Sequence, residues 1–118
     1  IHVVDQIFRA NLQRERHGFS ALNTPETPTL AALQAAVRAT DDWYCDYVAA
    51  RQETELAETV EFTFVDGKPG RMTRAEMLAH VITHSNYHRG AVGRILVQLD
   101  VAPPRDSLTV FMHRTQPS

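Results

Sequence analysis

Apolar positions at the start of the chain recur at helical spacing. The segment "IHVVDQIFRANLQ" predicts an amphipathic helix over about residues 1–15, and the apolar side of that helix carries Ile1, Val4, Phe8 and Leu12. Proline and glycine interrupt the pattern in "HGFSALNTPETPT", so residues 17–29 are predicted to form a surface connection. Thr29 is the expected N-cap of the next helix.

Residues 30–51 form the second predicted helix. This segment is rich in alanine, and its apolar residues recur at spacings of three, four and seven: Leu30, Leu33, Val37, Tyr44 and Val48. The acidic stretch "DDWYCD" inside it is interpreted as a solvated helix face, although Asp41 lies near the apolar side.

In the next segment, "VEFTFVDGKPGRMT", apolar residues recur at every second position, the spacing typical of a β-strand. Val60, Phe62 and Phe64 alternate with polar residues, and Asp66-Gly67 is a turn signal. We therefore expect a short hairpin or extended excursion between the second and third helices. An isolated hairpin is not stable alone, so it must pack against the helices.

The third predicted helix is the longest element and carries the pattern of greatest interest. It begins at a capping box formed by Thr73 and Glu76 and continues to about Leu99, before the Pro103-Pro104 stop. In the tail, one apolar patch predicts a short turn or helix that packs back on the protein; it consists of Leu108, Val110 and Phe111. These elements predict an all-α protein with one short hairpin.

Three histidines lie four residues apart in the third helix: His80, His84 and His88. Successive helix residues turn by about 100°, which places His88 about 40° from His84. That sector also holds the apolar residues Met77, Val81, Ala91, Val92, Ile95 and Leu99. The wheel therefore predicts that His84 and His88 point into the core and that His80 lies at the edge of the apolar stripe.

Two interpretations of this pair remain open. A single core histidine is usually satisfied by a backbone carbonyl or a tyrosine hydroxyl. Two imidazoles at positions i and i+4 instead converge on one point, where they make good ligands for a divalent metal. His2 falls on the opposite side of its helix from Val4 and is not expected to be a third ligand. His17 and His113 are interpreted as solvated.

Length, charge and cysteine content narrow the class of protein. The 118 residues fit one domain, and a net charge of -2 with dispersed arginines argues against nucleic-acid binding. The single cysteine, Cys45, excludes an internal disulfide and is interpreted as a small buried thiol in preference to a nucleophile or a fourth ligand. No segment has the length and apolarity of a membrane span or the pattern of a signal peptide. We expect a cytoplasmic protein with no membrane partner.

The segment "LAHVITHSNYHRGAVGRIL" closely resembles the signature helix of the DinB family, whose pattern is roughly H-V-x-x-H-x-x-x-H-R-G-Q. The resemblance extends in order to "VVDQIFRANL", "TDDWYCDYV", "TFVDGKPGRMTRAEML" and "LDVAPPRDSL". It implies a DinB-like four-helix bundle that holds one divalent metal ion through three histidines, two of which map onto His84 and His88. One position departs from the pattern, because Ala91 replaces the glutamine.

The resemblance also bears on what surrounds the metal. It places the third ligand just before Ile1, so residues 1–118 are expected to be one bundle domain that lacks its first helix and that ligand. His2 would substitute only if the first predicted helix were rotated. The metal is expected to be zinc, nickel or iron, because imidazole suits all three.

The activity implied is that of a metal-dependent enzyme, a thiol-dependent transferase or a hydrolase. Such an enzyme would activate a small thiol or water against a small electrophilic substrate. The alternative is a non-catalytic metal-binding bundle that acts in dimerisation or stress response. Relatives commonly pair as homodimers, and the remaining apolar face of the second helix is the candidate contact; it carries Leu30, Val37 and Tyr44.

Overall fold

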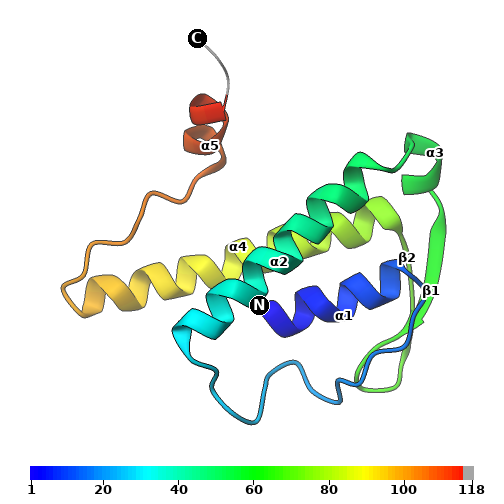
Figure 1. Cartoon of the computed structure of the whole chain (residues 1–118), viewed down its shortest axis with the longest axis horizontal. Coiled ribbons are helices and arrows are strands. Elements are labelled where there is room, and N and C mark those ends of the chain that lie inside the picture. The colour runs from blue at the N-terminus through cyan, green and yellow to red at the C-terminus, as the bar shows by residue number, and fades with distance from the viewer. Residues whose placement is uncertain (116–118) are drawn as a thin grey trace. The chain divides into compact units, whose positions relative to one another are not determined.

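A computed structural model of the chain describes residues 1–115 (Figure 1). Those residues form α1 (His2–Leu12), α2 (Leu30–Ala49), α3 (Glu53–Leu56), β1 (Thr59–Thr63), β2 (Pro69–Thr73), α4 (Arg74–Gln98) and α5 (Leu108–Thr115). The chain divides into two compact units, Ile1–His84 and the residues from Ser85 onward. The prediction of a mainly helical protein with one short hairpin is confirmed. No helix in this described part is long and apolar enough to cross a membrane.

The first unit has its core around α1. The buried apolar residues that pack together are Val4, Phe8, Leu12, Tyr47, Val60 and Met77. They come from α1, α2, β1 and α4, so one cluster joins every major element of this unit. The first helix is confirmed, and it ends at Leu12 because Arg14 adopts a left-handed conformation with a φ of 58°.

The second helix is also confirmed, including its cap. The Thr29 hydroxyl accepts a hydrogen bond from the backbone N–H of Ala32 at 3.2 Å. Its buried face differs from the predicted stripe, however, because Thr40 and Tyr47 are buried while Leu30 and Val48 are exposed. The other predicted positions, Leu33, Val37 and Tyr44, are half-buried, so the buried face is only displaced toward Thr40 and Tyr47. The short helix α3, which follows α2, was not predicted.

The predicted hairpin is present as an antiparallel pair. Val60 lies opposite Met72 and Phe62 lies opposite Gly70. The turn uses Gly67 in a left-handed conformation with a φ of 86°, and its N–H donates to the Phe64 carbonyl at 2.8 Å. The rings of Phe62 and Phe64 lie so close to Gly70 that a Cβ there would come within 2.6 Å of the Phe62 ring. Glycine is therefore required for the aromatic face of the hairpin.

The longest helix begins and ends as the sequence predicts. The Thr73 N–H donates to the Glu76 carboxylate at 2.7 Å, and the Glu76 N–H donates to the Thr73 hydroxyl at 3.1 Å, which completes the capping box. At the other end Asp100 is left-handed, with a φ of 58°. The predicted burial of the whole apolar stripe is wrong: Met77 is buried, but the later residues Val92, Ile95 and Leu99 are more than half exposed. Helical spacing specifies a shared face, and only a packed neighbour buries it.

The second unit contains the end of α4, a connecting segment and α5. The tail is helical as expected, and the Ser107 hydroxyl accepts from the Val110 N–H at 3.3 Å at its start. Within this unit Leu108 and Phe111 are more than half exposed. The packing of this tail on the rest of the protein stays a prediction.

Candidate metal centre

The three histidines of the signature helix occupy successive turns of α4. The helix is continuous from Arg74 to Gln98, so His80, His84 and His88 follow one another at the predicted spacing. All three side chains are half-buried. The wheel predicted that His84 and His88 point into the core, whereas each is only half-buried in the structure.

His80 is held in a stack of rings. Its imidazole lies 4.7 Å from the Phe8 ring centroid and 5.5 Å from that of His84, with interplanar angles of 30° and 27°. Phe8 in turn meets Phe62 edge-on at 6.0 Å. The stack connects the hairpin, α1 and α4, and it brings the Phe8 and His80 rings beside the His84 ring. The place of His80 on the helical wheel did not indicate these contacts.

Tyr44 and Asp5 join α2 to α1 on the buried side of the same unit. The Tyr44 hydroxyl donates to the backbone carbonyl of Asp5 at 2.5 Å, and Asp5 itself is buried. Burial, followed by the nearby Asp5 carboxylate, raises the pKa of Tyr44 well above its ordinary value of 10. Tyr44 thus remains a protonated hydrogen-bond donor at neutral pH. The side of α2 that was expected to serve a dimer contact is, at this residue, engaged with α1.

His2 lies in a different environment from the one that the wheel indicated. It lines a cleft of about 490 Å³ with the segment Thr24–Pro28 and the start of α2. Its Nδ1 is buried and has no hydrogen-bond partner among residues 1–115. Within the same residues, no group of three or more His, Cys, Asp or Glu side chains is arranged to hold a metal ion. The structure therefore does not bring His2 together with His84 and His88.

Acidification is expected to destabilise the protein through His2. Burial and, after it, the positive charge of the N-terminal amino group lower the pKa of His2 below its ordinary value of 6.5, and the Asp41 carboxylate opposes this only in part. Because the unfolded state then binds the proton more tightly, stability is highest above pH 6.5 and falls as the pH drops from 6.5 toward the folded-state pKa. Thermal unfolding of wild type and His2→Asn from pH 7.5 to 5 tests this: the slope below pH 6.5 should be smaller in the variant. Identical slopes would assign the acid sensitivity to other groups.

The turn that follows His88 is anchored by Arg89 within the second unit. The Arg89 Nε donates to the Asp106 carboxylate at 2.6 Å, and Nη1 donates to the Ser85 hydroxyl at 2.5 Å. The His88 ring meets Tyr87 edge-on at 5.4 Å. Arg89 and Asp106 both lie in segments that resemble the family, but no local pattern in the sequence links them. Ala91, where the family has glutamine, is exposed.

The remaining candidate residues lie outside this region or differ from expectation. Cys45 is exposed, so its interpretation as a buried thiol is wrong: it occupies the solvated face of α2. His113 is exposed as expected, with Nδ1 2.7 Å from the Thr109 carbonyl. His17 was interpreted as solvated, yet it is half-buried and its Nδ1 accepts from the Phe19 N–H at 3.3 Å.

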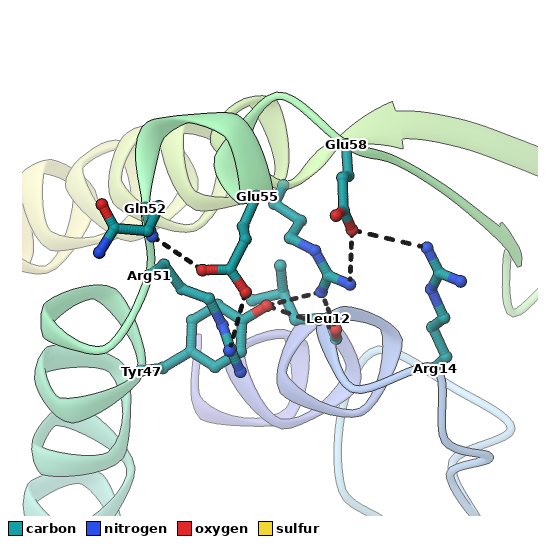
Figure 2. Close-up of polar contacts among 8 residues, drawn as sticks. Leu12, Arg14, Tyr47, Arg51, Gln52, Glu55 and Glu58 are labelled. Atoms are coloured by element: carbon teal, nitrogen blue, oxygen red, sulfur yellow. Dashed lines mark hydrogen bonds and ion pairs between the residues drawn. The ribbon is translucent and has the colours of Figure 1, made fainter.

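A polar cluster at the other end of the first unit holds the helices in place (Figure 2). The Arg74 Nη1 donates to the Tyr47 hydroxyl at 2.6 Å and to the Leu12 carbonyl, and Nη2 lies 3.5 Å from the Glu58 carboxylate. Arg14 meets the same carboxylate at 3.9 Å. This cluster ties the start of α4 to the ends of α1 and α2, and so positions the helix that carries the histidines.

These features define a mainly helical protein whose longest helix carries histidines on successive turns. The chain belongs to the DinB family, because the family model for the DinB family matches residues 1–118, the whole chain. The resemblance seen in the signature helix is thereby confirmed over the full sequence. No curated protein and no solved structure matches the chain significantly.

Proposed function

We propose that His84 and His88 bind a divalent metal ion, zinc, nickel or iron, and that the protein is a metal-dependent enzyme. The observation that carries this proposal is the pair of half-buried imidazoles one turn apart on α4, in a chain that belongs to the DinB family. In the proposed fold α1, α2 and α4 contribute to the family's four-helix bundle. The reaction class is transfer of a small thiol to a small electrophile, or hydrolysis of that electrophile.

The two imidazoles of His84 and His88 would supply part of the coordination shell of such an ion. Neutral imidazole is a ligand for each of these metals, and two such ligands leave positions for solvent or substrate. A metal ion held there would lower the pKa of a coordinated water or thiol and supply a nucleophile near neutral pH. Residues 1–115 offer no arranged group of three protein ligands. Protein ligands that leave coordination positions for solvent or substrate are typical of a catalytic metal site.

The chain's own residues would orient the two ligands. Stacking between Phe8 and His80 limits rotation of the neighbouring His84 ring. The ion pair from Arg89 to Asp106 restrains the turn that follows His88. Such restraint lowers the conformational entropy lost when two side chains converge on one ligand. Side chains outside the pair thus contribute to affinity without touching the ion.

A second candidate function is a non-catalytic metal-binding bundle that acts through dimerisation in a stress response. It is favoured by exposed apolar side chains at the end of α4 and directly after it, Val92, Ile95 and Leu99, and by the exposed Leu30 of α2. Burial of these side chains between two copies of the chain would stabilise a homodimer. Turnover of a small thiol separates the two functions, because only the enzyme requires it.

Metal content is the measurement that tests the site. The purified wild-type protein is expected to carry close to one equivalent of metal by elemental analysis. His84→Ala and His88→Ala should each lose at least about 90% of it, because removing one of two neutral ligands weakens binding by well over tenfold. His113→Ala is the matched control and should retain wild-type metal, since His113 is exposed on α5.

Two further measurements distinguish metal binding by the α4 histidines from a purely structural role, and an enzyme from a non-catalytic protein. Replacement of the native ion by Co²⁺ should produce visible absorption bands in wild type and in His113→Ala, but not in the two α4 variants. If wild type binds no metal while all variants keep their far-UV circular dichroism, the histidines are structural and the proposal fails. If metal is bound but thiol transfer and hydrolysis are both absent, the non-catalytic function is favoured.

A further inference from the structure

A second cleft lies within the first unit, at the end of α1. It has a volume of about 860 Å³ and is formed by the last turn of α1, the segment that follows it, and the hairpin β1–β2. In Figure 1 the chain that leaves α1 runs beside the hairpin. None of the α4 histidines lines this cleft. Its size falls in the range of small-molecule sites, about 300–1,000 Å³.

Asn11 contributes a buried donor to this cleft. The residue is only 6% exposed, and its amide nitrogen Nδ2 is buried without a hydrogen-bond partner among residues 1–115. A buried amide without a partner is unfavourable, so a side chain of this kind usually meets an acceptor. An oxygen atom of a ligand in the cleft would supply that acceptor.

The charges along the cleft limit what such a ligand can be. Arg16 and Arg71 line it and form no ion pair within the described part of the chain, whereas Arg14 is already near Glu58. Two carboxylates, Glu15 and Glu61, line it as well. With Arg14 set aside, two arginines and two glutamates remain, so the guanidinium groups of Arg16 and Arg71 can meet one negative charge but the cleft has no large positive excess. A dianionic phosphate would be repelled by the two carboxylates.

The hairpin adds an aromatic wall. Phe62 and Phe64 both line the cleft, and their rings meet edge-on at 5.0 Å. Phe62 is anchored from behind by Phe8 at 6.0 Å, and Gly70 leaves space for both rings. Aromatic faces of this kind bind planar or apolar groups. The polar part and the aromatic part of the cleft therefore suit a ligand that has a polar group at one end and an apolar group at the other.

We propose that this cleft binds a small organic monocarboxylate that carries an apolar ring. The carboxylate accepts from the Asn11 amide and from the guanidinium groups of Arg16 and Arg71, and the ring lies against Phe62 and Phe64. Guanidinium groups bind carboxylates through paired, charge-assisted hydrogen bonds, which gives the site its preference for this group. The site does not depend on metal at His84 and His88.

The test uses 3-phenylpropionate as the probe, followed by NMR on the ¹⁵N-labelled chain. Saturable binding with a shift of the Asn11 side-chain NH₂ signals is expected. Arg16→Gln and Arg71→Gln should each weaken binding by about tenfold or more, the usual effect of losing a charge-assisted hydrogen bond. Arg38→Gln, an exposed substitution on α2 outside the cleft, should change the affinity less than about twofold.

Two analogues of the probe test whether the cleft recognises a carboxylate group. The neutral alcohol 3-phenylpropanol should bind at least about tenfold more weakly, because it lacks the charge that the arginines recognise. Equal binding of the alcohol, or no shift of the Asn11 signals, would overturn the proposal. Tighter binding of phenyl phosphate than of the carboxylate would overturn the assignment to a monocarboxylate. Circular dichroism of each arginine variant establishes that a lost affinity does not reflect unfolding.

Discussion

Replacement of Arg74 by alanine is expected to lower the free energy of unfolding by about 2–4 kcal/mol. The Arg74 side chain is only 13% exposed, and its guanidinium group contacts the Tyr47 hydroxyl, the Leu12 carbonyl and the Glu58 carboxylate. Alanine would remove the donors that serve these three acceptors at the junction of α1, α2 and α4 (Figure 2). The buried acceptors would then lack their charged partner, and this loss dominates the effect.

Arg14 provides the matched control for this prediction. It meets the same Glu58 carboxylate, but at 3.9 Å and with a side chain that is 60% exposed. Arg14→Ala should therefore cost less than about 1 kcal/mol, as is usual for solvent-exposed ion pairs. Urea unfolding followed by circular dichroism measures both variants. Equal losses for Arg74→Ala and Arg14→Ala would mean that the charge on Glu58, and not the buried hydrogen bonds, supplies the stability.

Replacement of Met77 by alanine is expected to cost about 2–5 kcal/mol, the usual range for buried methionine or leucine. Met77 is 0% exposed and packs in the cluster that also contains Leu12 and Val60. Truncation would remove most of the side chain and leave a cavity where α1, β1 and α4 meet. The neighbouring elements are tied by the Arg74 contacts, so the cavity is not expected to collapse fully.

The control for Met77 lies on the same helix. Ile82 is 67% exposed, so Ile82→Ala should change stability by no more than about 0.5 kcal/mol. Urea unfolding of the two variants compares opposite faces of the first part of α4. A loss for Ile82→Ala as large as that for Met77→Ala would show that this face of α4 is covered in solution, for example by a second copy of the chain.

Local patterns in the sequence were sufficient to predict the main helices and the hairpin. The Thr29 cap, the Thr73–Glu76 capping box and Gly67 act over three or four residues, and each is found where the sequence places it. The period of apolar residues located the main helices and the hairpin. Family membership followed from the same short motifs, because they recur in order along the chain.

Tertiary contacts decided what lies beside the histidines. His80 is sandwiched between Phe8 and His84, and that stack depends on residues 72 positions apart in the chain. Similarly, Arg74 reaches Leu12 across 62 positions. A helical wheel reports which residues share a face, but it contains no information on which element covers that face. The metal pair could therefore be proposed from sequence, while the rings that support it could not.

The sequence by itself determined the helices, the hairpin, their caps and the family. Only the tertiary structure showed that Cys45 is exposed, that the His2 Nδ1 atom and Asn11 are buried, and that Val92, Ile95 and Val97 of α4 are exposed. The physical reason is the range of the interactions. Hydrogen bonds and steric preferences that set secondary structure act between near neighbours, whereas burial depends on packing between distant segments.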